Sequence, residues 1–79
     1  MDKGDVVRLA EILMDLKGIY QEIFSLEKKE DSAYNKMSHE NQYSVKGEIM
    51  LENVDYFDDA LEELDTCIDK LHSVLRNCK

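Results

Sequence analysis

The sequence has no proline, no tryptophan and only three glycines among its 79 residues. Proline and glycine interrupt regular structure more often than other residues do, so their scarcity favours a few long helices. The aromatic residues are four tyrosines and two phenylalanines, and we therefore expect a core that is mainly aliphatic. A chain of this length forms a single domain, which we expect to span residues 1–79.

Long hydrophobic runs, signal-peptide features and paired-cysteine motifs are also missing. No apolar run approaches the ~20 residues of a membrane-spanning helix, and the first residues are polar and acidic. Cys67 and Cys78 are separated by about 16 Å if they share a helix, which is too far for a disulfide within one chain. We therefore expect reduced thiols, no contact with a membrane, and a location in the cytoplasm of a bacterium or of an infected host cell.

Positive charge is scarce as well. The chain has 10 Lys and Arg against 18 Asp and Glu, which gives a net charge of −8. Phosphate groups and anionic lipids repel such a chain, so we expect no direct binding to nucleic acid. A basic protein surface is the partner that its electrostatics favour.

The segment from Met50 to Cys78 has the clearest pattern in the sequence. Its apolar residues recur at alternating intervals of four and three, which predicts a helix that packs lengthwise on another helix along this line, here called the seam. The other sides of the segment carry nine acids and no Lys or Arg between Glu48 and Asp69. The residues on this seam are Met50, Val54, Phe57, Leu61, Leu64, Ile68, Leu71, Leu75 and Cys78.

The first half of the chain repeats this layout. Asp2 or Asp5 is expected to cap the helix. A strict seven-residue register would then place Glu27 and Glu30 on the seam. Because a straight helix repeats at 3.6 residues, we expect the stripe to drift instead, so that both glutamates face solvent. Packing then passes to Ile23, Leu26, Ala33 and Met37, and the seam before this point consists of Val6, Leu9, Leu13, Leu16, Tyr20 and Ile23.

Each helix carries a second apolar stripe beside its seam, so each apolar face is wider than one contact line can cover. We expect an all-α fold: an antiparallel hairpin with helices at about 5–37 and 44–77 and a turn at about 38–43, capped by Ser38 or Ser44. Two hairpins are then expected to dimerise into a four-helix bundle. The open face alternatively belongs to a different partner. The stripes are Ile12, Ile19, Leu26 and Ala33 in the first helix and Ala60, Cys67 and Val74 in the second.

No group of residues amounts to a chemical site. Asp69 and His72 have the spacing found in carboxylate-bridged di-iron bundles, but the only acid expected at their level is Glu11, which faces solvent. His39 and the serines have no partner that would make them a catalytic pair. Phosphate-binding loops and zinc-type spacings are absent. We expect no enzyme activity, no cofactor and no metal.

The acidic outer face of the second helix, between Glu48 and Asp69, is the candidate binding surface. Its simplest interpretation is solubility. The functional interpretation is a row of charge that imitates a nucleic-acid backbone and occupies the basic channel of another protein. The residues expected to contact that partner are Glu48, Glu52, Asp55, Asp59, Glu62 and Asp69.

Residues 30–48 resemble a segment of small acidic helical-hairpin proteins from Firmicutes and their phages or prophages. Those proteins have a proline where this chain has Ser38, a leucine where it has Asn41 and an acid where it has Val45. The resemblance implies a helical hairpin and a phage or prophage setting, and it names no activity. The residues that agree are Ala33, Tyr34, Met37, Gln42, Ser44, Gly47 and Glu48, with Lys46 standing for an arginine.

Together these features predict a non-enzymatic protein-interaction or regulatory protein of phage or prophage type. The paired hairpins serve as the scaffold, and the acidic face makes the contact. The alternative is an inhibitor that imitates nucleic acid, similar in action to anti-CRISPR proteins, and that sits in the basic groove of a host defence nuclease. Phages carry many small acidic proteins that block host defence enzymes, which is why the resemblance raises this alternative.

Overall fold

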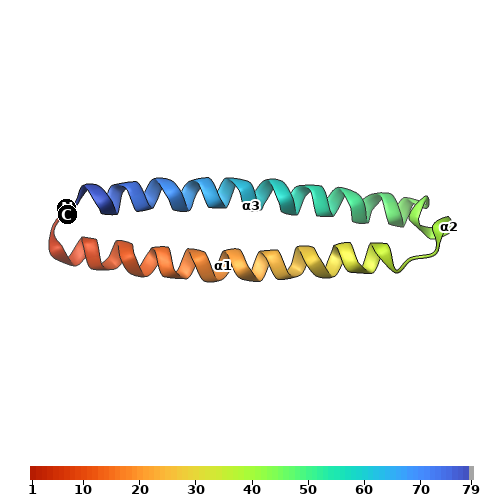
Figure 1. Ribbon diagram of the computed structural model, residues 1–79, viewed down its shortest axis with the longest axis horizontal. Coiled ribbons are helices and arrows are strands. Elements are labelled where there is room, and N and C mark those ends of the chain that lie inside the picture. The colour runs from red at the N-terminus through yellow and green to blue at the C-terminus, as the bar shows by residue number, and fades with distance from the viewer. Residues whose placement is uncertain (79) are drawn as a thin grey trace.

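The computed structural model describes residues 1–78 and is an all-helical hairpin, as the sequence predicts. Its elements are α1 (Lys3–Asn35), α2 (His39–Gln42) and α3 (Val45–Asn77). The two long helices run antiparallel and pack along their whole length, while α2 forms the corner that joins them (Figure 1). The result is a rod of 58 × 15 × 13 Å.

Side-chain caps fix where the long helices begin. The carboxylate of Asp2 accepts a hydrogen bond from the backbone N–H of Asp5 at 2.8 Å, so α1 starts at Lys3 and not at residue 5. The hydroxyl of Ser44 accepts a hydrogen bond from the N–H of Gly47 at 3.3 Å and caps α3 in the same way. Both helices are 33 residues long.

The apolar core is concentrated in the half of the rod that holds the chain ends. Leu9 and Leu13 of α1 and Ile68 of α3 are buried against each other, and Leu61 is buried farther along α3. The other residues predicted for the seams are half-buried, and Cys78 at the end of α3 is exposed. The half-buried residues that surround the cluster are Leu16, Tyr20, Leu64, Leu71 and Leu75.

The seam of α1 does not drift, and the expectation that Glu27 and Glu30 face solvent is wrong. Glu27 is only 6% exposed, and Glu30 is half-buried. Leu26, which was expected to take over the packing, is 51% exposed, and Ala33 is exposed too. Two long helices in lengthwise contact keep the seven-residue register by winding slightly around each other, so the glutamates stay on the seam.

The buried glutamates are accommodated by polar partners from α3. The Nδ2 group of Asn53 donates a hydrogen bond to Oε2 of Glu30 at 3.0 Å. Glu27 faces Asp58, and a hydrogen bond between the two carboxyl groups, followed by burial and by the charge of Asp58, raises the pKa of Glu27. Nζ of Lys28 lies 3.8 Å from Oε1 of Glu27 and offsets part of this effect. We call Glu27, Glu30, Asn53 and Asp58 the polar layer.

The corner, residues 36–44, is built by hydrogen bonds from its own side chains. Ser38 caps the single turn of α2 by accepting from the N–H of Asn41 at 3.3 Å. The side-chain amide of Gln42 donates to the carbonyl oxygen of Tyr34 at 3.0 Å and ties α2 back to the end of α1. A Cβ atom at Gly47 would lie 2.6 Å from the carbonyl oxygen of Asn41 and would collide with that of Gln42, so α3 can follow α2 this closely only with a glycine there.

Candidate interaction surfaces

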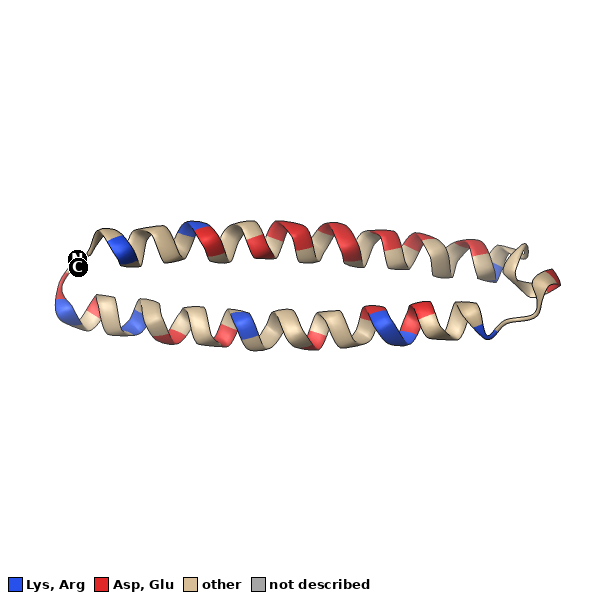
Figure 2. Cartoon of the chain, in the orientation of Figure 1, with Lys and Arg blue, Asp and Glu red and all other residues tan. Residues whose placement is uncertain are grey.

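The acidic face is a continuous exposed surface along the middle of α3. Figure 2 shows the acids following one another along the middle of α3, with no Lys or Arg between them. All nine acids between Glu48 and Asp69 are exposed. This range covers about 32 Å of helix at 1.5 Å per residue. The six predicted contact residues therefore lie on one exposed surface, together with Asp58, Glu63 and Asp65.

The charge of the acidic face is not neutralised within the hairpin. The two ion pairs found within residues 1–78 join Arg8 to Glu11 and Lys28 to Glu27, and both lie on α1. The pKa of the Tyr56 phenol is raised first by hydrogen bonding to Glu52, then by the charge of Glu52, and further by burial and by the charge of Asp59. The acidic face is therefore a surface of uncompensated negative charge.

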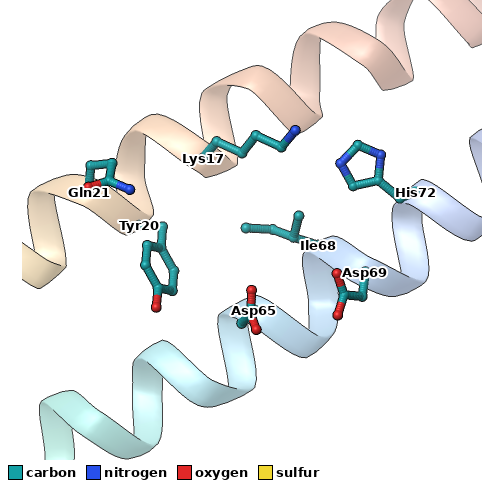
Figure 3. A pocket seen from close by; sticks show the side chains of 7 residues that line it. All are labelled: Lys17, Tyr20, Gln21, Asp65, Ile68, Asp69 and His72. Atoms are coloured by element: carbon teal, nitrogen blue, oxygen red, sulfur yellow. The ribbon is translucent and has the colours of Figure 1, made fainter.

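A shallow pocket of about 390 Å³ opens between α1 and α3 on one broad side of the hairpin. Lys17 extends from α1 toward the ring of His72 on α3, and Asp65 and Asp69 lie on neighbouring turns (Figure 3). Asp69 is exposed and His72 is half-buried, at the edge of the seam. No group of three or more potential metal ligands occurs within residues 1–78. The lining residues are Lys17, Tyr20, Gln21, Asp65, Ile68, Asp69 and His72.

The opposite broad side of the hairpin is apolar. Lys17 and Gln21 of α1 meet Asp65 and His72 of α3 on the pocket side, so the residues on the other flank of each seam share the other side. These residues are the second stripes predicted from the sequence. Ile19, Leu26 and Val74 are 44%, 51% and 41% exposed. We call this surface the apolar face, and it consists of Ile12, Ile19, Leu26, Ala33, Ala60, Cys67 and Val74.

The sequence did not reveal two features of these surfaces. Asp58 belongs to the acidic face and Asn53 lies beside the apolar face, but both also serve the polar layer, and only the alignment of the two helices shows this. Gly47, Gln42 and Ser44, which carry part of the resemblance, are the residues that shape the corner. These three residues therefore have a structural role in the turn.

Within residues 1–78, no helix combines the length and the apolar character needed to cross a membrane. Comparison with models of known protein families, with curated proteins and with solved structures gives no match for this chain. The surfaces of the hairpin are therefore the basis for a functional proposal.

Proposed function

We propose that this chain is a non-enzymatic protein-interaction or regulatory protein that works as a dimer of hairpins and binds a basic protein surface through the acidic face. The observation that carries the proposal is the row of nine exposed acids on α3, none of which forms an ion pair within residues 1–78. The resemblance at residues 30–48 supports a phage or prophage setting for this role.

Repulsion among the acids of the acidic face is the physical reason to propose a basic partner. Carboxylates three and four residues apart on a helix repel each other, and a solvated helix gains nothing from gathering them on one surface. A partner that presents lysines and arginines turns this repulsion into attraction and speeds association. Binding of this kind weakens as salt is added, because salt screens exposed charges beyond about 10 Å at 0.1 M.

A nucleic-acid mimic is the second candidate, and the charge spacing favours it. Nine acids over about 32 Å give one negative charge per about 3.5 Å of helix axis. One strand of double-stranded DNA carries one charge per about 3.4 Å of its axis. A groove that recognises the charge of a single strand would therefore meet a similar charge density on α3, and the natural target would be a host defence nuclease.

The test compares two triple charge reversals that change the net charge equally. Glu52→Lys with Asp55→Lys and Asp59→Lys alters the acidic face, whereas Glu11→Lys with Asp31→Lys and Glu40→Lys, the control variant, alters acids of α1 and α2. Each variant is titrated into cleavage assays with purified defence nucleases, CRISPR effectors included. We expect the wild type and the control variant to inhibit and the α3 variant to lose inhibition, with circular dichroism showing that all three are helical.

The outcomes separate the two candidates. Inhibition that is relieved by added nucleic acid identifies the mimic, because both ligands then compete for one groove. Binding that survives added nucleic acid identifies a different basic surface and supports the broader proposal alone. Equal binding by both triple variants, or equal loss from both, would show that the acidic face is not the contact.

A further inference from the structure

The hairpin exposes more surface than its size calls for. Its accessible surface is 5973 Å², whereas a compact monomer of this mass exposes about 4,900 Å². The excess of about 1,000 Å² is close to the ~800 Å² that each partner buries in a standard protein interface. A single seam between two helices leaves this area uncovered, and within residues 1–78 no third layer lies on either side of the helix pair (Figure 1).

The apolar face has the composition of an interface core. It carries no charged residue, and its side chains come from both long helices in two parallel rows. Three of its aliphatic side chains are between 41% and 51% exposed, which is far more than aliphatic residues in a buried core show. Contiguous exposed apolar surface of this kind marks a site of association.

The charged residues that border the apolar face identify the partner that binds there. The exposed positions that border it have nearly balanced charge, although the chain as a whole carries −8. A strongly acidic second copy is repelled by the acidic face and by the pocket side, where most exposed charges of α3 are acids, but it is not repelled here. The bordering residues are Arg8, Lys29, Lys36 and Lys70 against Asp15, Glu22 and Glu63.

We infer that the apolar face is the surface on which a second copy of this chain docks through a two-fold axis. The inference rests on the proposed dimer and adds which side of the hairpin forms it. In a two-fold dimer each copy presents the same patch to the other, so one self-complementary apolar surface is sufficient. The acidic faces of both copies then remain on the outside of the four-helix bundle, free for a partner.

The first test uses matched aspartate substitutions. Ile19→Asp and Cys67→Asp place a charge in the apolar face, whereas Met14→Asp and Thr66→Asp place the same charge on exposed residues outside it. Because the two-fold axis doubles each change, we expect the first pair to weaken the dimer by at least about 100-fold. The second pair should leave it intact. Sedimentation equilibrium over a range of concentrations gives the dissociation constants, and circular dichroism checks that each variant remains helical.

A second test measures how fast the two thiols of the chain react. Cys67 and Cys78 are both exposed on the single hairpin, but only Cys67 belongs to the apolar face. Above the dissociation constant, we expect alkylation of Cys67 to be at least about tenfold slower than in the monomeric Ile19→Asp variant, because the thiol must wait for the dimer to open. Alkylation of Cys78 should proceed at the same rate in both proteins and serves as the internal reference.

Three results would overturn the inference, and they are distinguishable. A wild type that stays monomeric at all concentrations refutes the proposed dimer together with its interface, and the apolar face then belongs to a different protein. A dimer that survives both Ile19→Asp and Cys67→Asp leaves the proposed dimer standing and refutes only its placement. Equal alkylation of Cys67 in the dimer and in the monomer refutes the placement independently.

Discussion

The half of the hairpin that holds the chain ends and the half that holds the corner occupy the same seam positions with different chemistry. Near the ends, Leu9 and Leu13 pack on Ile68. Near the corner, Glu27 takes a position on the seam of α1 equivalent to that of Leu13, and Glu30 bonds to Asn53. The comparison separates two requirements of a helix pair: the two helices must stay associated, and they must keep one alignment along their length.

Apolar contacts are strong but tolerate sliding. If α1 slipped by seven residues along α3, leucines would still meet aliphatic residues, so the end half alone does not fix the register. The same slip would separate Glu30 from Asn53, and it would bring Ala60 opposite Glu30 in one direction or Leu51 opposite Glu27 in the other. Buried polar pairs add little net stability, but they make misaligned states costly. We therefore expect the end half to set the strength of the hairpin and the polar layer to set its alignment.

The largest expected effect comes from the end half. Leu13 is 3% exposed, and Leu13→Ala removes its contacts with the cluster and leaves a cavity, which should lower the free energy of unfolding by about 3 kcal/mol. Met14 is 74% exposed, so Met14→Ala should change stability by less than about 0.5 kcal/mol. Urea unfolding at one fixed protein concentration checks both values. Equal losses would mean that the seam does not face α3 at Leu13.

A smaller loss of stability is expected from a substitution at the corner. Gly47→Ala brings a Cβ atom against the carbonyl oxygens of Asn41 and Gln42, and the shift of backbone this demands should cost about 1–3 kcal/mol. Gly18 provides the control, because a Cβ there meets nothing within 4 Å. Gly18→Ala should raise stability by up to about 1 kcal/mol through helix propensity. If Gly47→Ala were also stabilising in the same urea titration, the close approach of α2 to α3 would be refuted.

The smallest expected effect is a change in pH dependence at the polar layer. The pKa of Glu27 is raised in the folded chain above its ordinary value of 4.5, so protons bind the folded state more tightly than the unfolded one. This contribution to stability is fully present below about pH 4.5 and is lost as the pH rises through the raised pKa. We expect the Tm of the wild type to fall between pH 4.5 and 7, and Glu27→Gln to flatten that curve, because an amide donates to Asp58 without titrating.

Glu22→Gln is the matched control for this experiment. It removes the same charge from an exposed position of α1, so it reports how much of the pH dependence comes from the overall negative charge. A Glu22→Gln curve as flat as that of Glu27→Gln would show that the polar layer has no special part in the pH response. Thermal unfolding followed by circular dichroism, at one protein concentration, measures all three proteins.

The sequence was sufficient for the features that depend on one helix at a time. The alternating three- and four-residue spacing predicted the seam of α3 and the seam of α1 as far as Ile23, and the lack of proline predicted two uninterrupted helices. The second stripes, such as Ile19 and Val74, were found in the same way. The acidic face was visible too, because a run of acids on one helix stays on its surface in any arrangement of partners.

Features that depend on a contact between two segments could not be predicted from the sequence pattern of either segment alone. The position of Glu27 was mispredicted because its burial depends on an alignment that brings Asp58 opposite it. The requirement for glycine at position 47 arises from the single turn of α2, whose carbonyl oxygens point at α3. In both cases the deciding contact joins residues whose spacing in the sequence carries no periodic signal.

Both chain ends lie at the same end of the rod (Figure 1), and the sulfur atoms of Met1 and Cys78 are 3.7 Å apart. A short peptide would therefore join the ends without strain on either long helix, and the hairpin is suited to insertion into a surface loop of another protein. The host would then carry a stiff arm with the corner at its tip. Along a rod of 58 Å, that tip projects well clear of the host surface.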